Sequence, residues 1–284
     1  MARVLPPEAG LGSPWPYAQQ NLENLMKWDP LKYVEFGDYR NRPFFDLTAR
    51  VLAGHPAKVV DLGCGPGNLT ATLSDRWPGA EVVGVDSSAE MLARAARLAQ
   101  ERPSLHFEQA DIADWAPSPD TDVVVSNAAL QWVPGHQAML RGWLAALRPG
   151  AWFALQVPGN FDAPSHALMR ELASSAPWAG KLAGVLRGVE SVGEPGDYLG
   201  IMLDAGYVAD AWETTYQQVL PGRDPVLEWV RGTGLRPVLA ALAPDDAERF
   251  EAEYADALRD AYPQGPHGTV FPFRRIFAVG RRDG

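Results

Sequence analysis

A regular alternation of short apolar runs with helix-like stretches constrains the fold of this chain more than any other feature. The runs KVVDL (58–62) and EVVGVD (81–86) are rich in Val and are followed at once by Gly or Ser, which is typical of buried strands. Strands that alternate with helices at this spacing predict right-handed βαβ units, and therefore a mostly parallel α/β sheet covered on both faces. The expected strands are 58–62, 81–86, 105–111, 121–128 and 151–159, and the expected helices between them are 68–77, 87–101 and 133–150.

The second half of the chain is less regular and predicts a helical cap. We expect this cap at residues 222–266, inserted before the last strand of the sheet. It would lie over the carboxyl ends of the strands, where ligands bind in open α/β folds. The expected elements are helices at 165–175 and 196–207, a strand at 211–220, a helical stretch at 225–262 and a closing strand at 271–282.

The first 25 residues differ in character from the rest of the chain. They are rich in Pro and Gly, and they have neither helical periodicity nor the charged and apolar regions of a signal peptide. We predict a disordered leader or tag at 1–25 and one domain at 26–284. That domain is expected to open with a helix at 30–52, where Pro43 suits a first helical turn.

Charge and residue usage disfavour several classes of function. The chain carries a net charge of −10, whereas nucleic acids and anionic membranes attract basic surfaces, so neither is an expected partner. If the substrate is an anion, its positive charge must come from a few arginines gathered in a cleft. The histidines are too far apart for a metal site, and none is expected. One cysteine, and no apolar run near the roughly 20 residues of a membrane span, fit a cytoplasmic protein.

In the segment VVDLGCGPG the glycines directly follow a predicted strand and precede a helix. Its glycines let the backbone turn sharply and approach a ligand without a Cβ in the way. A dinucleotide site has the spacing GxGxxG and binds pyrophosphate, whereas Gly63, Gly65 and Gly67 have the spacing GxGxG after Asp61. An acid here repels phosphate and attracts an ammonium group. This favours S-adenosylmethionine (SAM), which has an α-amino group, a sulfonium and no phosphate, over NAD. Cys64 is expected to be a small loop residue, since no base is indicated beside it.

Polar residues follow the next three predicted strands. The carboxylate of Asp86 can accept both hydroxyls of a ribose, which suits SAM and NAD alike. Asp111 can take the exocyclic amine of adenine, and Ile112 can pack on its ring. The backbone at 126–128 can line the methionine end of the ligand. The predicted cofactor site comprises Asp61, Gly63, Cys64, Gly65, Gly67, Asp86, Ser87, Met91, Asp111, Ile112, Asn127 and Ala128.

The segments DLGCGPG, VVGVDSS, QADIADW and VVVSNAALQWV together resemble the class I SAM-dependent methyltransferases. More narrowly, WDPLKYVEFGDYRNRPF, SNAALQWVPGH, VPGNFDAPSH and VFPFRRIF are similar to the trans-aconitate 2-methyltransferase family. The resemblance covers about residues 26–280. It implies a Rossmann-like sheet of seven strands whose last strand runs antiparallel. It also implies that Tyr33 and Arg42 reach the methionine end of SAM, with Arg42 paired to its carboxylate.

The resemblance implies a substrate with three carboxylates. Planar arginine forks match carboxylates two bonds at a time, and the candidates are Arg40 beside Arg42, and Arg274 beside Arg275. Adjacent residues of a strand point to opposite faces, so only one of Arg274 and Arg275 is expected to face the pocket, and the sequence leaves open which. The predicted substrate-binding residues are Arg40, Trp132, Gln156, Asn160, His166, Arg274 and Arg275.

These features predict a carboxyl O-methyltransferase that esterifies a small polycarboxylic acid, with trans-aconitate as the expected substrate. A carboxylate is already ionised at neutral pH, so no general base is expected. Within the class, the alternatives are another small acid or a hydroxylated metabolite. From other classes, an NAD-dependent oxidoreductase is disfavoured by GxGxG after Asp61. A SAM-binding regulatory protein without turnover is disfavoured by the arginines and the expected cap.

Overall fold

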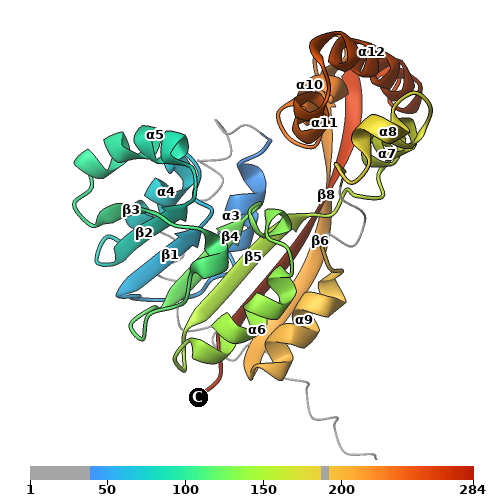
Figure 1. The fold of residues 1–284 in the computed structure, drawn as a ribbon. Coiled ribbons are helices and arrows are strands. Elements are labelled where there is room, and N and C mark those ends of the chain that lie inside the picture. Colours follow the sequence, from blue (N-terminus) through green and yellow to red (C-terminus); the bar gives the residue numbers. More distant parts are fainter. Residues whose placement is uncertain (1–38, 187–191) are drawn as a thin grey trace, which may run out of the picture.

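The computed structural model describes residues 39–186 and 192–284, so Tyr33 and the expected leader at 1–25 lie outside the described residues. Seven strands form one sheet in the order β3-β2-β1-β4-β5-β8-β6 (Figure 1), which confirms the predicted α/β fold. The strands are β1 (Lys58–Leu62), β2 (Glu81–Asp86), β3 (Leu105–Gln109), β4 (Val123–Asn127), β5 (Trp152–Pro158), β6 (Tyr207–Leu220) and β8 (Gly268–Arg282).

The strand directions match the expected topology. The first five strands are mutually parallel, and β8 runs antiparallel between β5 and β6. The strand order reverses between β1 and β4, and ligands bind at the carboxyl ends of the strands at such a point. An eighth strand, β7 (Gln264–Gly265), was not predicted; it spans two residues and pairs only with the start of β8.

Helices cover both faces of the sheet, as its continuous apolar strands require. On one face, Leu73 and Phe45 join a buried cluster with Val59 and Phe277; on the other, Trp143 and Tyr198 cover the sheet. The start of α5 is capped as its sequence predicts, because the backbone N–H of Met91 donates to Ser88 Oγ at 3.3 Å. The first face carries α3 (Arg42–Thr48), α4 (Asn68–Arg76) and α5 (Ala89–Gln100), and the second carries α6 (His136–Ala146) and α9 (Pro195–Asp204).

The predicted helix at 30–52 is wrong at its C-terminal end. It is also wrong at Tyr39–Asn41, which form a turn before α3. Pro43 lies in the first turn of α3 as expected, but the helix ends at Thr48. Beyond it, side chains of α4 and its C-cap take the place of helical donors. Arg76 donates to the carbonyl of Val51 at 2.6 Å, and Trp77 Nε1 donates to that of Ala53 at 3.0 Å. The polar backbone is therefore satisfied without further helical turns.

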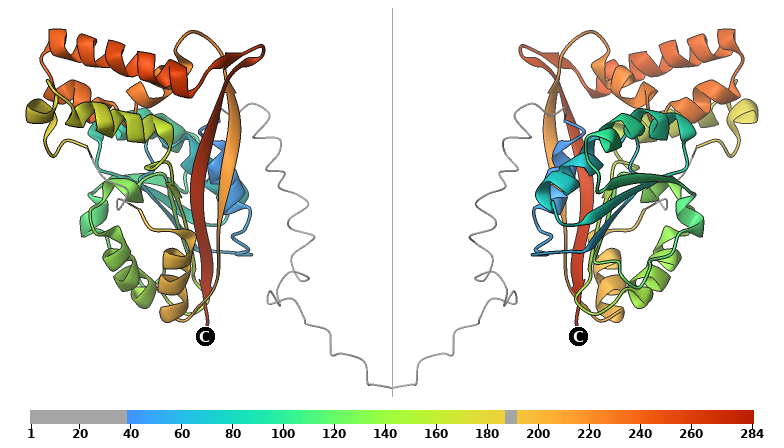
Figure 2. Two further views of the ribbon diagram at one scale, coloured as in Figure 1. Left: turned by 90° about the vertical axis from the view of Figure 1, so that its right-hand side faces the viewer. Right: turned by 90° about the vertical axis from the view of Figure 1, so that its left-hand side faces the viewer.

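Strands β6 and β8 are much longer than the others and form an antiparallel ribbon from Tyr207 and Arg282 to Leu220 and Thr269. The inner half of β8 is buried on both faces. In its outer half burial alternates, because only one face is covered. Figure 2 shows the outer half rising beyond the parallel sheet and carrying a layer of helices.

This layer is the helical cap expected before the last strand. It contains α10 (Pro225–Arg231), α11 (Arg236–Ala241) and α12 (Pro244–Ala261), joined by two helices from an earlier segment, α7 (Pro164–Ser174) and α8 (Ala179–Leu182), which were not assigned to it from the sequence. The cap has its own buried core around Trp178, Phe250 and Phe271. Tyr254 on α12 donates to the carbonyl of Ser165 on α7 at 2.6 Å, so a hydrogen bond joins two helices that are far apart in the sequence. Among the described residues, no helix has the length and apolar character needed to cross a membrane.

Candidate functional site

The glycine loop after β1 is held tightly against β2. The backbone N–H groups of Gly63 and Cys64 both donate to the carbonyl of Val85, at 2.8 and 3.1 Å. A Cβ on Gly63, where φ is +78°, would lie 2.2 Å from the Cβ of Ala129. Only glycine therefore fits this turn, and the close packing brings β1 next to the segment that follows β4.

Asp86 links the glycine loop to the end of β2. Its Oδ2 accepts from the backbone N–H of Gly65 at 2.8 Å, and its Oδ1 accepts from that of Ser88 at 2.9 Å. Each oxygen of an ionised carboxylate has a second acceptor position. Asp86 can thus order the loop and still accept two hydroxyls from a ribose. Ser87 is exposed beside it, and its carbonyl accepts from Gln109 at 3.2 Å.

Asp61 lies deeper, and its side chain is only 3% exposed. It accepts a hydrogen bond from Thr70 Oγ1 at 2.6 Å. Burial raises the pKa of Asp61 to about 6, the Thr70 hydrogen bond opposes this rise, and the charge of Asp86 adds to it. No cation pairs with Asp61 in the described part of the chain. An ammonium group bound nearby would restore the ionised form.

The adenine end of the predicted site is formed after β3. Asp111 Oδ1 accepts from the backbone N–H of Ala113 at 2.8 Å and thereby caps the short helix η1 (Ile112–Asp114), while its carboxylate stays exposed. Ile112 is buried, and its Cδ1 lies 3.5 Å from where a Cβ on Gly63 would stand. Cys64 is also buried, and burial raises the pKa of its thiol, so it fills space in the loop and is a poor nucleophile.

Two amide side chains lie near the carboxyl ends of β4 and β5, where Asn127 and Gln156 are partners in the parallel register. Asn127 Oδ1 and both polar atoms of the Gln156 amide are buried and have no hydrogen-bond partner among the described residues. Leaving a buried polar group unsatisfied costs about 1–3 kcal/mol. Next to them Ala128 has a φ of +55°, a conformation rare for alanine, and its carbonyl accepts from Gln131 at 2.6 Å. Strain and unsatisfied amides coincide at the point where SAM and substrate are expected to meet.

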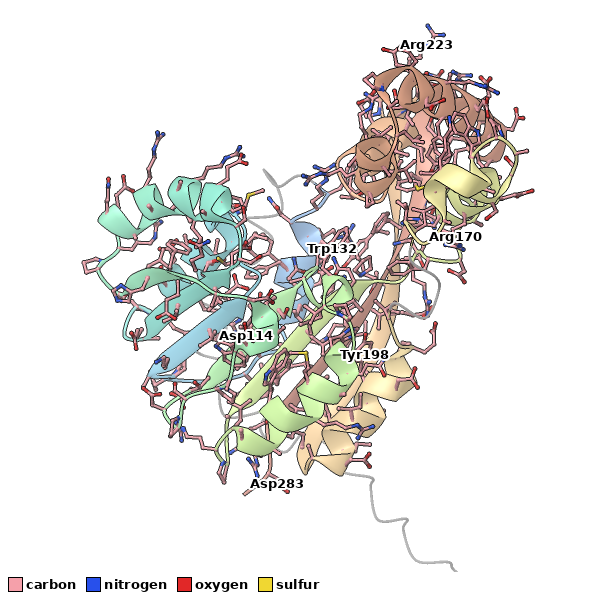
Figure 3. All side chains as sticks on the ribbon, viewed as in Figure 1. Asp114, Trp132, Arg170, Tyr198, Arg223 and Asp283 are labelled. Atoms are coloured by element: carbon pink, nitrogen blue, oxygen red, sulfur yellow. The ribbon has the colours of Figure 1, made fainter. Side chains whose placement is uncertain are left out.

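A cavity of about 240 Å³ lies between the ends of β4 and β5 and the cap. Trp132, at the end of η2 (Leu130–Trp132), stands on the body of the molecule, and Arg170 on the cap (Figure 3). The described lining contains three arginines and a histidine, but no Asp or Glu. In a chain of net charge −10, this is a local concentration of positive charge. Its polar or aromatic walls include Arg40, Gln131, Trp132, Phe161, His166, Arg170, Trp229, Phe273 and Arg275.

Arg275 lines this cavity and Arg274 does not. Arg275 is 6% exposed, its guanidinium lies 4.4 Å from the Phe273 ring centroid, and its Nε has no hydrogen-bond partner among the described residues. Burial lowers the pKa of Arg275 to about 10; Tyr216 opposes this shift and the charge of Arg40 adds to it, and the group stays charged at neutral pH.

Arg274 lies on the opposite face of β8. Its Nε donates to Glu213 at 2.9 Å and its Nη1 donates to Glu194 at 3.2 Å. These carboxylates raise the pKa of Arg274 above its ordinary value. Its charge is therefore satisfied within the protein, away from the cavity.

The structure places the other predicted substrate residues differently. The guanidinium of Arg40 lies 4.7 Å from the Trp229 ring centroid at the cavity wall. Asn160 is not in the described lining, and its amide is committed to backbone, because it donates to the carbonyl of Arg274 and accepts from its N–H, each at 2.8 Å. Arg42, which the resemblance assigns to the SAM carboxylate rather than to the substrate, is half-exposed and lies 3.8 Å from Asp46. Of the seven residues, Arg40, Trp132, His166 and Arg275 come together at the cavity.

His166 and Arg170 are one turn apart on α7. Burial lowers the pKa of His166 to about 4, with the charge of Arg170 adding to that effect and Asp162 opposing it, so the ring is neutral at pH 7. Arg170 was not predicted from the sequence. The i, i+4 spacing from His166 was the available signal, but it does not reveal which surface α7 faces.

Comparisons with known proteins agree with this geometry. Residues 59–150 match a family described as a methyltransferase domain. The chain is 54% identical over 264 residues to a trans-aconitate 2-methyltransferase of Streptomyces avermitilis, covering 91% of this chain and 98% of that one. It is 54% identical over 256 residues to a trans-aconitate 2-methyltransferase of Rhodococcus jostii, covering 89% of this chain and 99% of that one. A putative sarcosine dimethylglycine methyltransferase from Galdieria sulphuraria has a similar fold, with a TM-score of 0.53 at 12% identity over 89% of this chain and 91% of that one. With over half of its residues shared across nearly their whole length, this chain belongs to the trans-aconitate 2-methyltransferase family of class I SAM-dependent methyltransferases.

Proposed function

We propose that this protein transfers the methyl group of SAM to one carboxylate of trans-aconitate, giving a monomethyl ester and S-adenosylhomocysteine. The observation that carries the proposal is Arg275, a guanidinium almost fully buried in a cavity and without an ion-pair partner among the described residues. A buried charge without a partner is costly, and a carboxylate from a substrate supplies that partner. The named activity of the two bacterial relatives supports the same substrate.

The residues around the glycine loop suit SAM. The acceptor positions left on Asp86 fit two ribose hydroxyls, and Asp111 offers an exposed carboxylate to the adenine amine. Asp61 gives an anionic partner for the ammonium group, and the unsatisfied Oδ1 of Asn127 gives a further acceptor. A pyrophosphate at this loop would instead lie near the carboxylate of Asp61, so NAD fits poorly.

The chemistry requires alignment rather than proton transfer. SAM supplies an electrophilic methyl group on a sulfonium. A carboxylate oxygen forms the new O–C bond while the C–S bond breaks, and its electron pair stays on sulfur, so no proton is lost. Arg275, with Arg40 beside it, would hold a carboxylate that does not react, which orients the reacting one toward the glycine loop. With substrate bound, the aromatic side chains of Trp132, Trp229 and Phe273 would displace water from the cavity and leave the reacting carboxylate less hydrated.

The test is transfer of a labelled methyl group from SAM to a panel of di- and tricarboxylic acids and hydroxylated metabolites. We expect trans-aconitate to have the highest kcat/KM and the product to be a base-labile ester. Arg275→Met should abolish that preference, whereas Arg274→Met, on the other face of β8, should retain it. Methylation of a hydroxyl compound but of none of the acids would contradict the proposal.

A further inference from the structure

We propose that α7 of the cap carries a second carboxylate subsite, formed by Arg170 and His166, which selects tricarboxylates over dicarboxylates. The proposal rests on the proposed function and deepens it, because it assigns part of substrate recognition to α7 as well as to β8. Arg170 and His166 both line the cavity, on the wall formed by the cap. Arg275, on β8, provides positive charge from a different element of the same cavity.

The charge of Arg170 is available to a ligand. It forms no ion pair with a described residue, whereas two cap arginines outside the cavity are paired: Arg249 with Glu253 at 2.9 Å and Arg231 with Glu251. Asp162 acts electrostatically on His166 but is exposed and does not line the cavity. A carboxylate bound in the cavity would therefore give Arg170 a partner that the described residues do not supply.

His166 is arranged to bind an anion as a neutral hydrogen-bond donor. Its Nδ1 lies 3.2 Å from the hydroxyl of Ser165, and its ring contacts Phe161. When Nδ1 accepts from Ser165, the proton resides on Nε2. That nitrogen lies 3.5 Å from where a Cβ on Gly234, another lining residue, would stand, so it faces the cavity wall. A fork from Arg170 and an N–H from His166 together match one carboxylate.

Selectivity follows from the surroundings of this subsite. Around it the cavity is lined by apolar side chains of Met169, Val185 and Pro237, so a carboxylate placed there without Arg170 would be buried unpaired. Conversely, a dicarboxylate with one carboxylate on Arg275 and the other in the reacting position would leave Arg170 unpaired. Both mismatches lower affinity, and a third carboxylate removes both at once.

The experiment measures affinity by tryptophan fluorescence, since Trp132 and Trp229 line the cavity. S-adenosylhomocysteine is kept bound, so that every acid is compared as a ligand. The ligands are trans-aconitate and itaconate, mesaconate and cis-glutaconate, each of which lacks a different carboxylate of trans-aconitate. In R170Q we expect the Kd for trans-aconitate to rise at least about tenfold, and the Kd for one dicarboxylate to stay unchanged. R170K, which keeps the charge but not the fork, should fall between.

The matched control is R223Q. Arg223 is also a cap arginine, but its side chain is 91% exposed, lies 3.7 Å from Asp224 and stands at the far end of the cap from Arg170 (Figure 3). R223Q should bind all four acids as the wild type does. Equal affinities of wild type and R170Q for all four acids would overturn the subsite while leaving the proposed function intact. If the wild type methylates no acid at all, the proposed function fails, and the subsite with it.

Discussion

Arg274 and Arg275 are consecutive in β8, yet one guanidinium is bonded to Glu213 and Glu194 and the other is buried without a carboxylate partner among the described residues. The pleat of the strand produces this difference, because consecutive side chains lie on opposite faces. The same amino acid therefore stabilises the fold at one position and is held ready for a ligand at the next.

Arg275→Met should consequently stabilise the free protein while damaging substrate binding. Removing a buried, unpaired charge is expected to raise the free energy of unfolding by about 1–3 kcal/mol, in keeping with a pKa lowered to about 10. The KM for trans-aconitate should rise at least about tenfold, with the Kd for SAM unchanged. Urea unfolding and initial rates measure the two effects. Arg274→Met should instead lower stability by less than about 1 kcal/mol, because its ion pairs are exposed. Equal behaviour of the two variants would refute the assignment.

Asp86→Ala should weaken SAM binding by about tenfold or more, because the carboxylate both accepts from the ligand and orders Gly65. Asp86→Asn keeps one acceptor oxygen and should have an intermediate effect. Asp114→Ala is the matched control, an exposed aspartate on η1. Calorimetric titration with SAM measures all three. An unchanged affinity in Asp86→Ala would remove Asp86 from the site.

SAM affinity should fall as the pH drops through about 6. In the free protein the pKa of Asp61 is raised to about 6, and a bound ammonium group favours the ionised carboxylate and so lowers that pKa. Above pH 6 Asp61 is already ionised and SAM binds with its full affinity. Below pH 6 Asp61 is protonated and must release its proton before it can pair with the ammonium group, so the affinity falls. Calorimetry between about pH 5 and 7.5 measures this slope. Asp61→Asn should bind more weakly and show a flatter profile; an identical slope in the variant would assign the effect elsewhere.

The rate of methyl transfer should be nearly independent of pH from about 6 to 8.5, because a carboxylate nucleophile is already ionised there. In the described cavity lining, the candidate base is His166, whose pKa of about 4 keeps it neutral across this range. Single-turnover measurements of wild type and His166→Gln should give parallel, flat profiles. A rise with an apparent pKa near 7 in the wild type that is lost in the variant would establish a general base and favour a hydroxyl substrate.

The part of the molecule that could be predicted from the sequence depends on local patterns. The valine-rich strands and the glycine loop carry their signals within a few residues, so the fold and the position of Asp86 followed directly. The length of α3 could not be predicted, because its end depends on Arg76 and Trp77, which come from beyond the next strand. Tertiary contacts override local propensity at such positions.

The substrate cavity required the folded chain. The alternation along β8 predicts that one of Arg274 and Arg275 faces the pocket, but only the position of the cap determines which. Arg170 was missed because α7 joins a cap whose other helices come from much later in the sequence. Asn160 was assigned to the substrate, whereas its amide bonds to the backbone of Arg274, a pairing that no local pattern reveals.

The cap is built around buried side chains of its own, and none of them belongs to the two clusters that cover the sheet. We therefore expect changes inside the cap core to leave the packing around the glycine loop and Asp86 intact. A descendant of this protein can change its preference among carboxylic acids by substitutions in α7 or α12, while the residues expected to bind SAM stay the same. Laboratory evolution aimed at other carboxylic acids has the same freedom, and libraries confined to the cap should retain a high fraction of SAM-binding members.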